Sequence, residues 1–161
     1  QGAHAFAKGG WAQKVTHYGN RGASGIDGST STALGSAWMS SKPTLLITGE
    51  LSAQYDLNAM LQSNIPVNLH LLIVNNGGGQ IFQVIDGPKF APNHESHFLF
   101  QHERSFEDAA NYLKVPYLSA HDMKSFESAV AQMMQSPNAA ILEVFTDPMA
   151  SERSWKRRQD A

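Results

Sequence analysis

The fold is decided by the stretch Leu69-His70-Leu71-Leu72-Ile73-Val74-Asn75-Asn76-Gly77-Gly78-Gly79, where an apolar run ends in two amides and three glycines. An apolar run without alternation, bounded by turn residues, is typical of a strand buried on both faces of a parallel sheet. Ligands of such sheets bind beyond the carboxyl ends of the strands. Because Asn75 and Asn76 lie at that end, the sequence predicts a buried strand that leads directly into a ligand site.

Other apolar runs extend this pattern along the chain. Three of them resemble the first, at 45–48, 116–118 and 140–145, and 15–18 is expected to be a weaker fifth strand. Helical periodicity lies between the runs, at 30–39, 55–61, 106–113 and 124–135. Strands that alternate with helices predict an α/β fold, with a mostly parallel sheet covered by helices on both faces.

The length of the chain is that of one domain. We expect the 161 residues to form a single diphosphate-binding domain, with a poorly defined N-terminal end at 1–14 and a C-terminal extension at 147–161. The first 14 residues have no initiator Met and no clear apolar period. This opening predicts a fragment, a processed chain or an engineered end.

Polar residues mark the starts of the last two predicted helices. Ser105 with Asp108 resembles a capping box, and Asp122 is expected to cap the helix that follows it. On that second helix, Met133 and Met134 are both assigned to the apolar face.

The composition argues against several classes of partner. A net charge of −2 provides no broad basic surface for nucleic acid or an anionic membrane, and the one basic run, Lys156-Arg157-Arg158, is expected to be a solvated helix end. The sequence has no apolar window long enough for a membrane span and no signal peptide pattern, so we expect a cytoplasmic protein. The absence of cysteine excludes disulfides, thiolate metal sites and a cysteine nucleophile.

A second strand end also carries a ligand-forming residue. Glu50 follows Gly49 directly after the run 45–48. Mg²⁺ prefers oxygen ligands and shares its shell between a few protein groups, water and phosphates, so Glu50, Asn76 and a carbonyl near Gly78 would form a suitable set. The spacing alone leaves a second interpretation open, in which the glycines form only a turn and Glu50 lies beside a helix N-cap.

A second glycine-rich stretch joins the weak strand to the first helix: Asn20-Arg21-Gly22-Ala23-Ser24-Gly25-Ile26-Asp27-Gly28-Ser29-Thr30. Two further motifs follow it, Gly49-Glu50-Leu51-Ser52 with Tyr55-Asp56-Leu57-Asn58, and the stretch from Asn75 to Phe82. In this order and spacing, the motifs resemble the C-terminal, diphosphate-binding domain of the MenD family, the SEPHCHC synthases of menaquinone biosynthesis. The resemblance extends from about 15 to 146.

The resemblance implies an activity and its cofactors. Members of this family use thiamine diphosphate and Mg²⁺ or Mn²⁺ to decarboxylate 2-oxoglutarate. They then add the resulting succinyl carbanion equivalent to isochorismate, forming 2-succinyl-5-enolpyruvyl-6-hydroxy-3-cyclohexene-1-carboxylate. The chain is therefore expected to be part of a thiamine-dependent transferase.

The resemblance also assigns roles to residues at matching positions. Glu50, Asn76 and the carbonyl of Gly78 take the metal positions, although the family has aspartate where this chain has Glu50. The cofactor contacts are Ser24, Gly25, Ile26, Gly49, Leu51, Ser52, Gly79 and Gln80, and the substrate pocket includes Arg21, Ile81 and Phe82. Ile26 is expected to hold the cofactor in its bent shape, and Arg21 to bind a substrate carboxylate.

Enzymes of this kind complete their active site with a second domain. The resemblance implies a pyrimidine-binding domain, supplied by the rest of the chain or by a partner subunit, and a homo-oligomer, dimer or tetramer. That domain does not fit within 161 residues beside this one, so the chain alone is expected to be inactive. The alternatives are another thiamine enzyme, such as an acetolactate-synthase-like decarboxylase, or a cofactor-free domain of the same fold.

One long irregular segment, 86–102, follows the asparagine turn and is expected to form a lid. It contains His94, His97 and His102, which invite comparison with a zinc site. No cysteine or well-spaced carboxylate completes such a set, so we interpret the histidines as polar residues of a loop.

Overall fold

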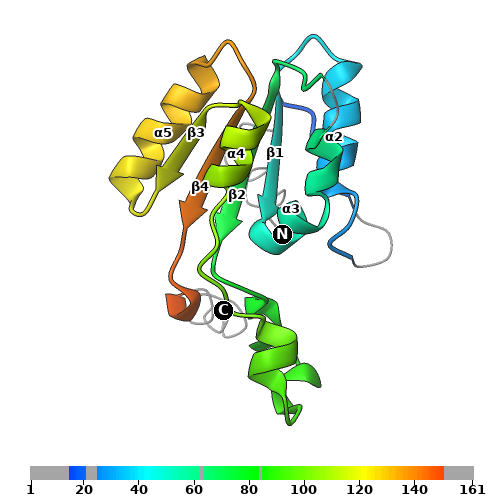
Figure 1. The fold of residues 1–161 in the computed structure, drawn as a ribbon, viewed down its shortest axis with the longest axis vertical. Helices are drawn as coiled ribbons and strands as arrows, with labels where there is room; N and C mark the ends of the chain where they lie inside the picture. The colour runs from blue at the N-terminus through cyan, green and yellow to red at the C-terminus, as the bar shows by residue number, and fades with distance from the viewer. Residues whose placement is uncertain (1–14, 21–24, 62–63, 84, 151–161) are drawn as a thin grey trace.

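The computed structural model describes residues 15–20, 25–61, 64–83 and 85–150. In this part of the chain, one sheet contains four parallel strands: β1 (Thr44–Gly49), β2 (Leu69–Asn75), β3 (Tyr117–Ala120) and β4 (Ala140–Phe145). Their spatial order is β1-β2-β4-β3, so the strand formed by the run 69–74, β2, lies in the interior of the sheet (Figure 1). The α/β fold predicted from the sequence is confirmed.

Helices connect the strands. The α-helices are α2 (Ser29–Trp38), α3 (Glu50–Tyr55), α4 (Glu107–Leu113) and α5 (Met123–Gln135). Short 3₁₀-helices cover Leu57–Leu61, Gln80–Gln83 and Pro88–Phe90, and a π-helical turn covers His94–Leu99. None of the described helices has the length and apolar character that crossing a membrane requires.

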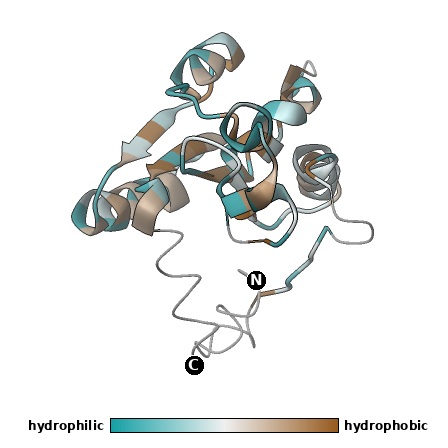
Figure 2. Cartoon of the chain, turned by 90° about the horizontal axis from the view of Figure 1, so that it is seen from below, coloured by the Kyte–Doolittle hydropathy of each residue, from teal (hydrophilic) through white to brown (hydrophobic). Residues whose placement is uncertain are grey.

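Two hydrophobic cores lie on opposite faces of the sheet. On one face, Leu34 of α2 and Ala110 of α4 pack in one cluster with Ile73 of β2. On the other face, Met133 of α5 packs in a cluster with Leu142 of β4. The helices carry both hydrophobic and hydrophilic stretches, as expected for elements with one buried side (Figure 2). The prediction of helices on both faces is therefore confirmed.

Four local predictions were wrong, and the fourth concerns the cap of α4 described in the next paragraph. The segment 15–18 is irregular and exposed rather than a strand. The region 55–61 is not one helix, because α3 ends at Tyr55 and a 3₁₀-helix follows. Met134 is 46% exposed although its neighbour Met133 is fully buried, since adjacent residues on a helix point about 100° apart.

The two predicted helix caps differ in outcome. Asp122 and Ser125 form a reciprocal capping box at α5, with the Ser125 N–H donating to Asp122 Oδ1 at 2.7 Å. The hydrogen bonds from Ser125 lower the pKa of Asp122 below its usual value. At α4 the N-cap position is Phe106, and Ser105 accepts only the Glu107 N–H at 3.3 Å, so the predicted box with Asp108 does not form.

His70 gives the fold a pH dependence. It is 4% exposed near the start of β2, and its Nδ1 has no hydrogen-bond partner. Burial lowers the pKa of His70, so the unfolded chain takes up this proton more readily than the folded one. The stability that follows from this difference is fully present above about pH 6.5, the usual histidine pKa, and declines as the pH falls toward the folded value.

We expect the urea midpoint of the wild-type chain to fall between pH 7.5 and pH 5.5. The midpoint of His70→Leu should fall less over the same range, because this variant lacks the titrating group. An equal fall in both proteins would contradict this explanation.

A long excursion separates β2 from α4. It includes the three helical turns of 80–99 and extends beyond the carboxyl ends of the strands, where it is drawn in green in Figure 1. We call the part of the excursion that leaves β2 the outgoing limb and the part that leads back to α4 the returning limb. The two limbs pair through backbone hydrogen bonds. The Gly79 N–H donates to the Leu99 carbonyl at 2.6 Å, and the His102 N–H donates to the Gly77 carbonyl at 3.1 Å. The returning limb therefore lies against the glycine turn.

Candidate functional site

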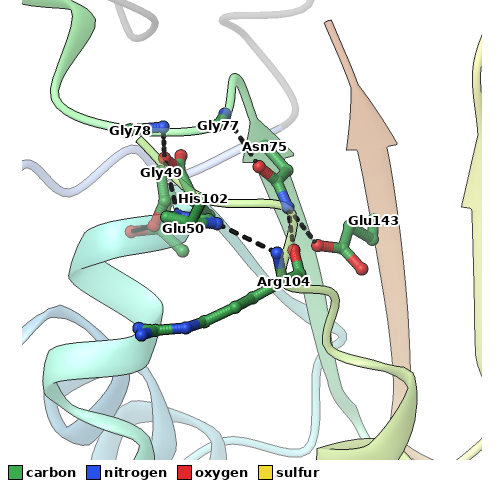
Figure 3. A network of polar contacts seen from close by, with 9 residues as sticks. Gly49, Glu50, Asn75, Gly77, Gly78, His102, Arg104 and Glu143 are labelled. Atoms are coloured by element: carbon green, nitrogen blue, oxygen red, sulfur yellow. Dashed lines mark hydrogen bonds and ion pairs between the residues drawn. The ribbon is translucent and has the colours of Figure 1, made fainter. Parts of the chain in front are cut away.

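The first component of the site is a buried carboxylate at the end of β1. The strand ends at Gly49, which is the N-cap of α3, and Glu50 is the first residue of that helix. Glu50 is only 2% exposed, and its Oε1 accepts the Gly78 N–H at 2.8 Å (Figure 3). The β1–α3 corner therefore places Glu50 against the glycine turn that follows β2.

The second component is the amide of Asn76. One terminal atom of this amide lies 3.2 Å from Oε1 of Glu50 and 2.7 Å from the carbonyl oxygen of Gly78. If that atom is nitrogen, it donates a hydrogen bond to both oxygens. If that atom is oxygen, the oxygens of Asn76, Glu50 and Gly78 face one another with no proton between them. The two orientations of the amide occupy the same space, so the turn can accommodate either.

The convergence of three oxygens matches the shell of a small divalent cation. Octahedral Mg²⁺ holds its ligands at 2.0–2.1 Å, which places adjacent oxygens about 2.9 Å apart. The two separations in the structure, 2.7 and 3.2 Å, lie on either side of that value. The donor set of Glu50, Asn76 and Gly78 is therefore compatible with a small cation when the amide oxygen of Asn76, and not its nitrogen, faces the other two oxygens.

His102 is a neighbour of the site that the sequence analysis did not assign to it. The imidazole is 5% exposed, and its Nδ1 accepts the Arg104 N–H at 3.2 Å. An accepting Nδ1 leaves the proton of the neutral ring on Nε2, which faces Glu50 Oε1 at 3.7 Å. The return of the excursion thus brings a buried imidazole nitrogen, which has no hydrogen-bond partner among the described residues, beside Glu50.

A third group of buried polar residues lies beside the glycine turn that follows β2. Glu143 of β4 is fully buried and accepts from Asn75, Phe106 and Tyr117. The sequence analysis missed this residue, although a charged residue inside the apolar run 140–145 was a usable signal. A buried carboxylate has to be satisfied by hydrogen bonds, so its presence in such a run indicates nearby donors.

A hydrogen bond connects the predicted cofactor residue Ile26 with α3, the helix that begins at Glu50. Ser52 on α3 donates its hydroxyl to the Ile26 carbonyl at 2.7 Å, which ties the glycine-rich loop to the helix that begins at Glu50. The Ile26 side chain is 49% exposed. A large apolar side chain fixed by its backbone and left exposed is available for contact with a ligand. Leu51 is half-buried on the same helix.

Other predicted residues are less closely connected with the three oxygens. Gly25 and Gly49 are exposed, and Arg21 and Ser24 lie outside the described residues. Gly79 and Gln80 are buried at the start of the excursion. These positions remain predictions for cofactor and substrate contacts.

The two residues predicted to line the substrate pocket, Ile81 and Phe82, have different surroundings. Phe82 packs edge-to-face on Phe98 of the predicted lid, with ring centroids 5.7 Å apart. Ile81 is 48% exposed. The described cavity nearest the asparagine turn, about 280 Å³, is lined by Asn76 and His102 among others but not by either predicted wall residue. A larger cavity lies at the opposite ends of the strands, beside Pro116 and Ala139, far from this chemistry.

The histidines of the excursion have separate partners. His94 Nδ1 lies 2.8 Å from the Pro88 carbonyl, and His97 Nδ1 lies 2.8 Å from the Ser96 hydroxyl. Within the described ranges, no three His, Cys, Asp or Glu side chains group as metal ligands. The candidate site therefore relies on amide and carbonyl oxygens in addition to one carboxylate.

Three relatives found by comparison with known proteins share one name. A 2-succinyl-5-enolpyruvyl-6-hydroxy-3-cyclohexene-1-carboxylate synthase of Flavobacterium johnsoniae is 43% identical over 128 residues, which are 79% of this chain and 23% of that protein. Proteins of the same name from Flavobacterium psychrophilum and Christiangramia forsetii are 41% and 36% identical, over 79% and 84% of this chain and 23% and 24% of theirs. No family model matches the chain. The chain thus spans about a quarter of the length of these curated relatives.

Proposed function

We propose that this chain, which is related to a segment of the SEPHCHC synthases (MenD), is the thiamine-diphosphate-binding part of such an enzyme. The complete protein would decarboxylate 2-oxoglutarate and add the succinyl unit to isochorismate. The observation that carries the proposal is the convergence of Glu50, Asn76 and the Gly78 carbonyl at the ends of β1 and β2. The identity to the named synthases supports the reaction class.

In this proposal Glu50, Asn76 and the Gly78 carbonyl would hold Mg²⁺ or Mn²⁺, which would neutralise the charge of the cofactor diphosphate. Bound thiamine diphosphate supplies the electron sink that decarboxylation of a 2-oxo acid requires. The protein contributes position and electrostatics. Ile26 supports the cofactor from an exposed apolar surface, and Ser52 holds the backbone of that loop in place.

The remaining roles concern the substrate and the partner domain. Arg21 binds a substrate carboxylate through a planar pair of donors, and Ile81 with Phe82 excludes water from the reacting end. A pyrimidine-binding domain, from the rest of a longer chain or from a second subunit, completes the site. Without that domain the chain is inactive.

Calorimetry tests the proposal directly. Thiamine diphosphate is titrated with Mg²⁺ into this chain mixed with a pyrimidine-binding domain of the family, and Mn²⁺ binding is followed in parallel by electron paramagnetic resonance. We expect metal-dependent cofactor binding and formation of the succinyl adduct from 2-oxoglutarate and isochorismate. The absence of any binding heat at millimolar cofactor would refute the proposal.

Replacement of the carboxylate tests the assignment of Glu50. Glu50→Gln removes the charge but keeps an oxygen that can accept the Gly78 N–H, so the fold should survive. We expect Mg²⁺ affinity to fall by about 100-fold, because changes outside the ligand shell already cost about 10–100-fold. Glu95→Gln, at an exposed glutamate of the excursion, serves as the matched control and should bind normally. Equal Mg²⁺ affinity in both variants would remove Glu50 from the site.

A further inference from the structure

One buried side chain, Glu143, forms hydrogen bonds with both ends of the excursion. Glu143 lies on β4, directly beside Ile73 of the central strand, and is fully buried. Its Oε1 accepts from the Asn75 side chain at 2.7 Å, where the outgoing limb starts. Its Oε2 accepts the Phe106 N–H at 2.8 Å, where the returning limb ends. One carboxylate therefore joins the two ends of a loop of about 30 residues.

Asn75 extends this connection to the glycine turn. Its Nδ2 donates a second hydrogen bond, to the Arg104 carbonyl at 2.9 Å. Its Oδ1 accepts the Gly77 N–H at 3.0 Å (Figure 3). Asn75 is 4% exposed, so water does not replace these partners. The amide holds the outgoing limb, the returning limb and the turn in one arrangement.

The turn held in this way carries the candidate metal ligands. Gly77 adopts φ +74°, and the next residue, Gly78, directs its N–H to Glu50 and its carbonyl to the Asn76 amide. A change in the position of Gly77 would therefore move the carbonyl that faces the cation. We propose that Asn75 and Glu143 are positioning residues that set the Gly78 carbonyl for metal binding, without touching metal, cofactor or substrate.

This inference rests on the proposed function, and Tyr117 provides a matched control for it. The Tyr117 hydroxyl donates to the same Oε2 of Glu143 at 2.7 Å, but Tyr117 belongs to β3 and not to the excursion. Burial, and then the hydrogen bond to Glu143, raise the pKa of Tyr117 far above its usual value, so the hydroxyl remains a donor. Tyr117→Phe removes one hydrogen bond from the carboxylate and the contact of its hydroxyl with Ser105, and it leaves the bonds from Asn75 and Phe106 to Glu143 in place.

The experiment compares Asn75→Ala, Glu143→Gln and Tyr117→Phe in the full-length protein that carries this sequence. Mn²⁺ affinity is measured at saturating thiamine diphosphate, and stability is measured by urea unfolding. We expect the first two variants to lose about 10–100-fold in Mn²⁺ affinity, the range seen for groups that orient ligands. Tyr117→Phe should lose stability but less than about twofold in affinity. If Asn75→Ala fails to fold, the Mn²⁺ affinity of Glu143→Gln decides whether the positioning role holds.

Hydrogen exchange gives a readout that needs no cofactor. The Gly79 and His102 amides, which pair the two limbs, should exchange about tenfold faster in Asn75→Ala and at the wild-type rate in Tyr117→Phe. Unchanged exchange at these amides would overturn the positioning role. Failure of the wild-type protein to bind Mn²⁺, with the expected exchange pattern, would instead refute the proposed function and leave the positioning of the turn established.

Discussion

Gly78→Ala is expected to weaken metal-dependent cofactor binding by more than about 100-fold and to destabilise the fold by about 3 kcal/mol. Gly78 has φ +146°, a conformation that side chains rarely adopt. A Cβ at this position would lie 2.4 Å from the Leu99 carbonyl oxygen and 3.2 Å from that of Phe100. The backbone must move to relieve this overlap, and any movement displaces the carbonyl and N–H that face Asn76 and Glu50.

Two measurements check this expectation. Mn²⁺ affinity at saturating thiamine diphosphate should fall by more than about 100-fold, because a ligand and its neighbour are displaced together. The urea midpoint should fall as well. Gly35→Ala is the control: Gly35 lies within α2, a Cβ there meets nothing within 4 Å, and the substitution should stabilise the chain by about 0.5–1 kcal/mol. Wild-type binding by Gly78→Ala would show that the close approach of the limbs is not needed.

Ile73→Ala is expected to cost about 2–5 kcal/mol of unfolding free energy. Ile73 has no exposed surface, lies in the central strand β2 and belongs to the core beneath α2 and α4. Removal of its side chain leaves a cavity that the rigid sheet cannot close. This loss is a large part of the 5–15 kcal/mol that stabilises a typical domain.

An isoleucine on the neighbouring strand provides the comparison. Ile47 lies on the edge strand β1 and is 44% exposed. Ile47→Ala should cost about 1 kcal/mol or less in urea unfolding of this chain. Similar losses in the two variants would mean that the core does not lie where the burial of Ile73 places it.

Much of the architecture could be predicted from local pattern. The apolar run 140–145 coincides with β4, and the run that opens the sequence analysis coincides with β2 apart from one residue. Such runs are visible because burial on both faces requires apolar side chains at every position. The segment 15–18 lacks this continuity, and the structure leaves it irregular.

Helix starts were harder to predict where the helix is short. α3 begins at Glu50, five residues before the apolar pattern from which a helix was expected at 55–61. Its six residues include only Ala53 as a buried apolar side chain, so periodicity has almost nothing to repeat. The position of Glu50 therefore depends on the preceding strand and not on the helix pattern.

The sequence by itself determined the kind of sheet and the polar residues at the ends of its strands, because strand burial and turn chemistry are local properties. Only the tertiary structure decided which polar atoms meet. Glu50 reaches Gly78 across 28 residues and Asn75 reaches Glu143 across 68, and the lid histidine His102 arrives beside Glu50 through the pairing of two loop limbs. Contacts at such separations depend on strand order and chain reversal, which side-chain periodicity does not specify.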